Sequence, residues 1–358
     1  MHFYESSIIT TKDGLHCQVY GNEHPVKGIL VKPKYIPTDK IACDALQCRF
    51  IAGKKMNRLS MWSDKASLAE YISKFKQAYP HYVYESELHD KERLFFWVPV
   101  ECIERIYFPR RGLSELMSMP EKSLDEHLKV AYNFTNFLLG SGLRLKDFGI
   151  TYSTLMGHYM SNLSDINMVV YGKENFWKLM AFLKEAKHPS LRWKSEKEWM
   201  EFYNKRNRFK IFDSKKFLWH AERKKSEGYF KDSLFVIFAA EREEETWFKW
   251  GQEKYSSLGL ATVEGIVEDS HSSVVRPGCY TVKEAKITDG PEAAEEIEKI
   301  VFYSRDYSQL ALPGERICAR GLLEKVEPKK GEPYCRVVTG YLDAYITGRR
   351  EQEFIKVM

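Results

Sequence analysis

At 358 residues and 42.0 kDa the chain is longer than one typical domain, and roughly two or three domains are expected. Its hydrophobic share of 44% and aromatic share of 14% exclude a disordered chain, because they provide enough apolar surface for packed cores. The net charge of +5 permits an acidic partner such as RNA or a nucleotide but does not require one.

The seven cysteines are scattered along the chain, without the spacing of a disulfide framework or of a zinc site. The first residues are polar and have no apolar core, so they do not resemble a signal peptide. No apolar run approaches the about 20 residues that cross a bilayer. We therefore expect a cytoplasmic protein with reduced thiols and no membrane partner.

Residues 1–118 are expected to form a strand-rich α+β domain. Runs of β-forming residues alternate with Gly-containing turns, and one stretch has the apolar spacing of a helix. The expected strands are 7–11, 15–20, 27–35 and 94–100, and the expected helix is 66–76.

Residues 119–252 are expected to form a mixed α/β core. Ser123 and Glu126 match a capping box, which predicts that a helix begins near Leu124 and ends at Gly140. Further helices are expected at 174–187, 195–205 and 214–226, and a buried strand at 232–239.

Residues 253–358 alternate short β-rich runs with Gly and Pro turns. This spacing predicts a small antiparallel β-barrel or sandwich. The whole sequence therefore predicts an α+β multidomain fold, with a strand-rich N-terminal domain, a mixed α/β core and a β-rich C-terminal domain.

The stretch 149–172, GITYSTLMGHYMSNLSDINMVVYG, has the pattern that points most directly to chemistry. A turn of small residues precedes a strand that opens with Ser-Asp-Ile-Asn. Because side chains alternate along a strand, Asp165 and Asn167 share one face while Ile166 enters the core. Two carboxylates at this spacing bind a divalent metal, and here the second is an amide.

A small-residue turn ahead of a metal-binding strand also lets backbone N–H groups and a hydroxyl approach phosphates. Nucleotidyl transfer needs both features, since Mg²⁺ bridges the phosphates and activates the attacking hydroxyl. The candidate catalytic and metal-binding residues are Asp165 and Asn167. The candidate phosphate-binding residues are Gly149, Thr151, Ser153 and Ser164.

These residues resemble an archaeal family of predicted nucleotidyltransferases in the polymerase-beta-type nucleotidyltransferase superfamily. That family has Gly-Ile-Thr-Gly-Ser at the turn and Ser-Asp-Ile-Asp-Leu-Val-Val-Tyr-Gly on the strand. The wider layout is similar too, from a Thr-Lys-Asp-Gly stretch near the start to a β-rich C-terminal region. The resemblance implies a nucleotidyltransferase-like core, Mg²⁺ as cofactor and a nucleoside triphosphate as substrate.

Two positions depart from the family pattern. Tyr152 stands where the family has Gly, and its side chain is expected to crowd a phosphate and to disfavour a positive φ. Asn167 replaces the second carboxylate, so Mg²⁺ binding is expected to be weak or lost. The superfamily's third carboxylate has no counterpart within 233–239. The candidates for it are Asp232, Glu241 and Glu174.

Residues 204–231 form a basic segment with interleaved aromatic residues. Basic side chains bind phosphates and aromatic rings stack on single-stranded bases, so the segment is a candidate for nucleic-acid binding. A helix with a basic solvent face and its aromatic residues in the core explains the same pattern. The nucleic-acid candidates are Lys205, Arg206, Arg208, Lys215, Lys216, Arg223 and Lys224.

Three functions are compatible with these features. The first is a nucleotidyltransferase-fold protein that binds a nucleotide or an RNA end through the turn and Asp165, with weak or no activity. The second is an active metal-dependent nucleotidyltransferase with an unforeseen third carboxylate. The third is a non-enzymatic RNA-binding or scaffold protein that uses residues 204–231. His158, between the turn and Asp165, is either a packing residue or a contact to substrate.

Overall fold

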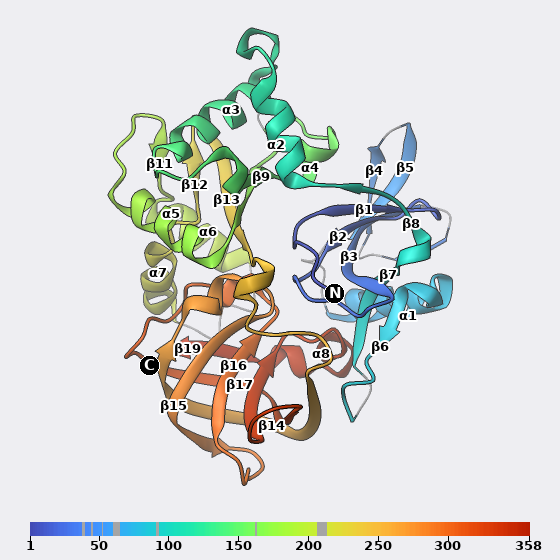
Figure 1. Cartoon of the computed structure of the whole chain (residues 1–358), viewed down its shortest axis with the longest axis vertical. Coiled ribbons are helices and arrows are strands. Elements are labelled where there is room, and N and C mark those ends of the chain that lie inside the picture. Colours follow the sequence, from blue (N-terminus) through green and yellow to red (C-terminus); the bar gives the residue numbers. More distant parts are fainter. Residues whose placement is uncertain are drawn as a thin grey trace.

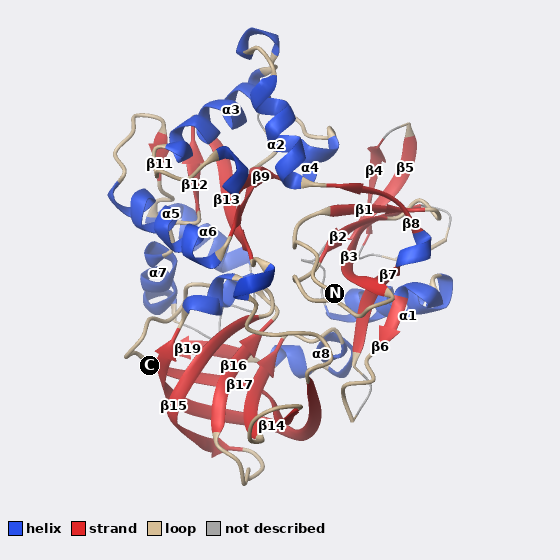
Figure 2. Cartoon of the chain, in the orientation of Figure 1, coloured by secondary structure: helices blue, strands red, loops and turns tan. Residues whose placement is uncertain are grey.

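The computed structural model describes most of the chain, and its three β-sheets and its helices form an α+β multidomain protein (Figure 1, Figure 2). None of the described helices is long and apolar enough to cross a membrane. The described residues are 1–37, 40–43, 46–51, 53–59, 65–90, 93–161, 163–205 and 213–358.

The N-terminal region forms an eight-stranded sheet with one long helix packed on it. The strands run in the order β4-β5-β3-β2-β1-β8, and β7 pairs with both β3 and β6. Tyr71 and Phe75 of the helix are buried in the same hydrophobic cluster as Ile9 and Val31 of the sheet. The expected helix and strands are confirmed. The elements are β1 (Ile8–Thr11), β2 (His16–Val19), β3 (Gly28–Pro37), β4 (Leu46–Ile51), β5 (Lys54–Leu59), α1 (Lys65–Ala78), β6 (Val83–Glu85), β7 (Leu94–Pro99) and β8 (Ile103–Tyr107).

Strands β4 and β5 form a hairpin at the edge of this sheet. Basic residues interrupt the alternation typical of a strand here, so the sequence pattern does not predict the hairpin. Its residues pair from Leu46 with Leu59 to Ile51 with Lys54, and β5 joins it to β3. In Figure 1 the hairpin projects past β1 and β8.

The central region forms a five-stranded sheet in the order β11-β12-β13-β10-β9. Its middle strand β10 runs parallel to β13 and antiparallel to β9. The expected helices and the expected buried strand are confirmed. The elements are α2 (Pro109–Ser118), α3 (Glu126–Leu139), β9 (Phe148–Ile150), α4 (Tyr152–Met156), β10 (Ile166–Tyr171), α5 (Lys173–Glu185), β11 (Leu191–Arg192), α6 (Glu196–Lys205), α7 (Ser214–Arg223), β12 (Glu227–Phe230) and β13 (Ser233–Ala240).

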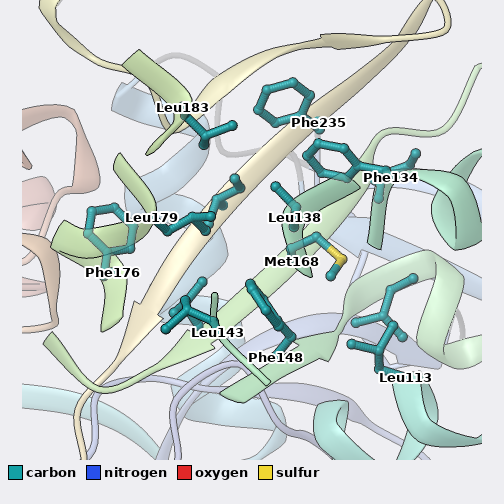
Figure 3. Packing of buried hydrophobic residues seen from close by; sticks show 14 of the residues in the cluster. Leu113, Phe134, Leu138, Leu143, Phe148, Met168, Phe176, Leu179, Leu183 and Phe235 are labelled. Atoms are coloured by element: carbon teal, nitrogen blue, oxygen red, sulfur yellow. The ribbon is translucent and has the colours of Figure 1, made fainter. Parts of the chain in front are cut away.

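The core of the central region lies on one face of this sheet (Figure 3). Met168 of β10 packs there together with residues of α2, α3 and α5. The rings of Phe134 on α3 and Phe235 on β13 have their centroids 4.5 Å apart. Helix α2 contributes Leu113 to this cluster, although the expected domain boundary lies after it, at residue 118. The other face of β10 is therefore left for contacts with the N-terminal region.

Helix α3 begins later than the capping-box pattern predicts. Its N-cap is Asp125, whose side chain accepts a hydrogen bond from the backbone N–H of Leu128 at 2.9 Å. The hydroxyl of Ser123 instead donates to the carbonyl of Pro120. The prediction of Ser123 as the N-cap is wrong, because a carboxylate close by makes a stronger, charge-assisted cap.

The C-terminal region forms a six-stranded sheet in the order β14-β15-β16-β18-β17-β19. β14 also pairs with β17, so the pairings return to their starting strand. Most pairs are antiparallel as expected, but β16 and β18 are parallel, because β18 lies between two strands that are consecutive in the chain. The elements are β14 (Glu253–Asp269), β15 (Gly278–Asp289), β16 (Ile297–Phe302), β17 (Arg316–Pro328), β18 (Tyr334–Thr339), α8 (Asp343–Thr347) and β19 (Phe354–Val357).

Candidate functional site

The small-residue turn connects β9 to α4. Gly149 is buried in β9, where a Cβ atom would lie 2.8 Å from Pro109 of α2. The hydroxyl of Thr151 donates to the carbonyl of Ser6 at 2.5 Å, and its N–H donates to the carbonyl of Asn167 at 2.9 Å. Both residues have packing roles here, and their contacts to phosphate stay a prediction.

The two candidate serines occupy opposite ends of the segment between β9 and β10. Ser153 lies in the first turn of α4 and is half-buried. The hydroxyl oxygen of Ser164 accepts a hydrogen bond from the backbone N–H of Met160 at 2.9 Å, which closes the loop ahead of Asp165.

Tyr152 adopts a left-handed backbone conformation with a φ of 55°. The expected steric cost of a Cβ atom at a positive φ does not prevent this conformation, because the turn keeps the shape suited to glycine at a cost of about 1 kcal/mol. The phenol group makes several contacts in return. Its oxygen accepts a hydrogen bond from Nε2 of Gln18 at 2.7 Å, and its ring centroid lies 3.8 Å from Nζ of Lys34. Its ring also packs edge-on against Phe238, with centroids 5.6 Å apart.

Asp165 and Asn167 lie at the beginning of β10, as the sequence predicts. Asp165 is half-buried and directly precedes the strand, whereas Asn167 is 4% exposed. The residue beside Asn167 on β13 is Val236, so the neighbouring strand offers no acidic partner there. In the described part of the chain, no three His, Cys, Asp or Glu side chains come together as metal ligands.

The candidate third carboxylates do not approach Asp165 in this sheet. Strands β10 and β13 are parallel, and Asp165 lies at their N-terminal ends. Glu241 directly follows the C-terminal end of β13, and Glu174 lies on α5, which follows the C-terminal end of β10. Both residues are therefore at the opposite end of the strands from Asp165. Glu241 is paired with Lys173 at 2.7 Å, and burial raises the pKa of its carboxyl to about 7. Asp232 precedes β13 on the same edge as Asp165, but it is exposed in the β12–β13 turn.

The N-terminal segment, residues 1–7, covers the face of β10 that carries Asn167. The ring of Tyr4 packs edge-on against Tyr171, with centroids 4.9 Å apart, and it belongs to the cluster of Val169 and Tyr171. The guanidinium of Arg110 lies 4.1 Å from the ring centroid of Tyr171. The Tyr171 end of this face is therefore covered by the protein's own chain.

The basic segment divides between core packing and contacts with the C-terminal region. Phe217 and Ala221 of α7 are buried with Trp199, as expected for a helix with aromatic residues in a core, whereas Trp219 of the same helix is 45% exposed. Arg223 forms an ion pair with Glu315 at 3.0 Å, and Nζ of Lys224 donates to the carbonyl of Asp306 at 2.5 Å. Burial lowers the pKa of Lys224 to about 8. The remaining candidates stay predictions: Lys205, Lys215 and Lys216 are described, whereas Arg206 and Arg208 lie outside the described residues.

His158 packs against the N-terminal sheet. Its Nε2 lies 3.2 Å from the hydroxyl of Tyr35, and the two rings meet edge-on. Burial, with a smaller effect from the charge of Lys34, lowers the pKa of His158 to about 4. The histidine is therefore neutral near neutral pH, and the contact supports its interpretation as a packing residue.

A cavity of about 610 Å³ lies where the three sheets meet. Its described lining comes from β2, β3, β4, β5, α1 and β7 of the N-terminal region, from Tyr152 of the central turn, and from the segments around residues 276, 303–306 and 340–345 of the C-terminal region. We call it the junction cavity. Tyr152 is the residue of the 149–172 stretch that lines it, because Asp165, Asn167 and the candidate phosphate-binding residues lie outside its described wall.

One part of the junction cavity is strongly cationic. Lys34 and Arg58 line it and form no ion pair with a described acidic residue. Burial, together with the charge of Arg58, lowers the pKa of Lys34 to about 7, while Asp165 opposes this shift. The other described charged lining residues are Lys32, Arg276, Arg305 and Asp306.

Glu5 holds two of these cations in place. Its Oε1 lies 2.8 Å from Nη1 of Arg276 and 2.6 Å from Nη2 of Arg305, and its side chain is 1% exposed. The Arg276 guanidinium stacks on Tyr20 at 4.2 Å, and the Arg305 guanidinium lies 3.6 Å from the ring centroid of Phe238. The carboxylate therefore links both C-terminal arginines to the N-terminal segment, and Arg305 also contacts the central sheet through Phe238.

The other part of the cavity is apolar and aromatic. Leu30, Phe95 and Phe96 contribute to it, and Tyr71 of α1 lies beside them. The Tyr71 hydroxyl is buried and has no hydrogen-bond partner within the described structure. A buried hydroxyl without a partner costs about 1–3 kcal/mol, and this oxygen faces the core beside the cavity rather than the cavity itself. The cavity suits a molecule with an anionic end and a flat apolar body.

Sequence reasoning did not find the residues of this cavity. Lys34 and Arg58 lie on strands without any motif, and Arg276 and Arg305 are more than two hundred residues further along the chain. No local signal distinguishes them from surface cations, because their convergence depends on how the three sheets pack.

Comparison with known proteins identifies a relative of similar length. The chain is 28% identical over 355 residues to the uncharacterized protein MJ1086 of Methanocaldococcus jannaschii, covering 98% of this chain and 97% of that protein. No family model matches the chain. No solved structure matches it. The chain is therefore similar to an archaeal protein along nearly its whole length.

Proposed function

We propose that this protein binds a nucleotide in the junction cavity and that its nucleotidyltransferase-like core has weak or no transferase activity. The observation that carries the proposal is the cavity itself, which combines cations with aromatic walls at a size suited to a small ligand. Phosphates would meet Lys34 and Arg58, and the base would lie among the aromatic residues near Tyr71. The nucleotide could be free or the end of an RNA.

The arrangement of the central elements supports the ancestry part of this proposal. A short strand, a turn with a positive φ, a short helix and a strand preceded by Asp165 follow one another, and a second strand lies parallel to β10. Mg²⁺, if it binds, would meet the Asp165 carboxylate and the Asn167 amide oxygen. We also propose that the C-terminal strands form a small β-barrel, because the pairing of β14 with both β15 and β17 closes their order into a ring.

Low activity is supported by the charges around Asp165. The face of β10 that would hold the metal offers one carboxylate, while Glu241 and Glu174 lie at the opposite end of the strands. Losing a partner of a metal site typically costs about 10–100-fold in affinity or activity. The alternative of an active enzyme would need Asp232 to reach Asp165 from its exposed turn. RNA binding through residues 204–231 is the other alternative, weakened because Arg223 and Lys224 contact the C-terminal region.

Isothermal titration with ATP and CTP, each with and without Mg²⁺, tests the proposal. We expect heat of binding at micromolar to millimolar nucleotide, and little dependence on Mg²⁺. Absence of binding at millimolar nucleotide would remove both nucleotide-based functions and leave the RNA-binding alternative.

The Tyr71→Phe variant is expected to raise the free energy of unfolding by about 1 kcal/mol, because it removes a buried hydroxyl that has no hydrogen-bond partner among the described residues. Nucleotide affinity should stay unchanged, because that oxygen has no surface exposed to the cavity. Tyr132→Phe on α3, which does not line the cavity, is the matched control. Urea unfolding that shows Tyr71→Phe to be less stable than the original protein would mean that the hydroxyl makes a stabilising contact.

Restoring the family pattern tests the ancestry of the central core. Asn167→Asp combined with Tyr152→Gly adds a carboxylate, and at φ 55° the glycine removes backbone strain. We expect the ratio of ATP affinities with and without Mg²⁺ to rise about tenfold. Tyr152→Gly alone is the control, since it opens the cavity wall without adding charge. A ratio that stays flat in the double variant would show that Asp165 does not belong to a metal site.

A further inference from the structure

The β4–β5 hairpin is basic and free of acidic residues. Residues 46–59 contain Arg49, Lys54, Lys55 and Arg58 but neither Asp nor Glu. All four basic side chains are exposed. None of them forms an ion pair with a described acidic residue. A projecting hairpin with this charge is available to a polyanion.

Three of these cations share the face of the hairpin that leads to the junction cavity. Arg49 is opposite Met56, Lys54 is opposite Ile51, and Arg58 is opposite Gln47, so all lie on one face. Gln47 and Arg58 line the cavity at the base of the hairpin. Lys34 lines the same cavity as Arg58. Its pKa is lowered first by burial and then by the charge of Arg58, so the two cations lie close enough to repel each other, and the row of positive charges extends from the hairpin into the cavity.

The other face of the hairpin presents an aromatic ring beside a cation. Phe50 is 79% exposed and lies directly opposite Lys55. Its neighbours on this face, Cys48 and Asn57, form another cross-strand pair and offer no apolar surface to cover it. A lone exposed ring among basic side chains is typical of a stacking platform for unpaired bases. An element that binds a lipid surface instead presents an extended apolar face, and a single exposed ring does not provide one.

We propose that the hairpin binds single-stranded nucleic acid and leads the end of the strand to the junction cavity. The strand passes over the edge of the hairpin: Lys55 contacts a phosphate and Phe50 stacks on a base on one face, and the following phosphates meet Lys54, Arg49 and Arg58 on the other face, toward Lys34. This inference rests on the proposed function, because the last nucleotide of the strand occupies the nucleotide site. It assigns the partner to the hairpin rather than to residues 204–231.

Fluorescence anisotropy with labelled RNA and DNA oligomers of about 12 nucleotides tests this inference, a length within the site size of single-strand modules. For Lys54→Ala combined with Lys55→Ala we expect about tenfold weaker binding. The slope of log affinity against log salt concentration should fall in magnitude by about 1.4, because each of the two lost phosphate contacts contributes about 0.7. Phe50→Ala should weaken binding at least about fivefold, by loss of stacking. Comparing the RNA with the DNA oligomer identifies which strand is preferred.

The matched control is Lys329→Ala combined with Lys330→Ala, the same charge change in the exposed β17–β18 turn, which does not line the cavity. Binding that falls equally in the control, or that stays unchanged in both hairpin variants, overturns the inference. So does tighter binding to a duplex of the same length, or to vesicles containing phosphatidylglycerol, than to the single strand. Circular-dichroism melting of each variant checks that it is folded.

The failure of this inference can be distinguished from failure of the proposed function. Lys54 and Lys55 do not line the cavity, so ATP binding should be unchanged in their double variant. If ATP binds to the original protein but the oligomers do not, the hairpin inference is wrong and the nucleotide site remains. If ATP does not bind either, the proposed function has failed.

Discussion

Replacing Glu5 with Gln is expected to lower the free energy of unfolding by about 3 kcal/mol, the lower end of the cost of breaking a buried ion pair. The carboxylate is buried and lies within 2.8 Å of two guanidinium groups, those of Arg276 and Arg305. Removing its charge leaves both cations in a site with little solvent. Because the Arg305 side chain is 23% exposed, partial hydration should keep the loss at the lower end.

Urea unfolding followed by circular dichroism measures this loss. The control is Glu115→Gln, which removes a carboxylate that is 71% exposed and 3.8 Å from Arg111. That change should alter the free energy of unfolding by less than about 0.5 kcal/mol. Equal effects of the two substitutions would show that Glu5 does not hold the C-terminal arginines.

The same Glu5→Gln variant is expected to bind nucleotide more tightly, provided that unfolding is kept negligible. Removing one negative charge beside Arg276 and Arg305 raises the positive potential at the cavity wall. If stability falls while affinity rises, the Glu5 carboxylate stabilises the folded protein but weakens the binding of an anionic ligand. A parallel loss of both properties would contradict an anion site at this wall.

Replacing Lys34 with Ala is expected to weaken nucleotide binding about tenfold or more at pH 6.5, the value of a charge-assisted hydrogen bond. The pKa of Lys34 is lowered to about 7 by burial and by Arg58, so the free protein loses this charge progressively as the pH rises through 7. A bound phosphate raises the pKa, and binding above pH 7 therefore requires uptake of a proton. Affinity should fall as the pH rises, by up to about tenfold per unit.

Titration with ATP between pH 6.5 and 8.5 measures this dependence. The control is Lys34→Arg, whose guanidinium stays charged throughout, so its affinity should not fall over this range. The ionisation of the ligand's own phosphate affects both proteins equally and cancels in the comparison. Curves of the original protein and the Arg variant that run parallel would show that Lys34 does not meet the anion.

Much of the fold could be predicted from the sequence, because the signals are short in range. Alternating β-formers between Gly turns predicted β1–β3, and apolar residues at helical spacing predicted α1 and α5. The exceptions have local physical causes. Asp125 rather than Ser123 is the N-cap of α3. In the β4–β5 hairpin, basic residues interrupt the alternation of apolar and polar residues that would predict a strand.

The candidate site could be predicted only in part. The sequence located Asp165 and Asn167 at the start of a strand and the turn before it, and the structure has them there. It did not predict that Tyr152 keeps a positive φ, or that its phenol group contacts Gln18 and Lys34 across a domain boundary. Those contacts depend on residues more than one hundred positions apart in the chain.

The sequence by itself determined the local elements and the order of the three regions, because periodicity and turn residues act within a few positions. It also determined that the Ser-Asp-Ile-Asn motif has one carboxylate and one amide. Only the tertiary structure decided where charge gathers. Lys34, Tyr152 and Arg305 belong to three different regions, and they line one cavity because the packing of the sheets places them together.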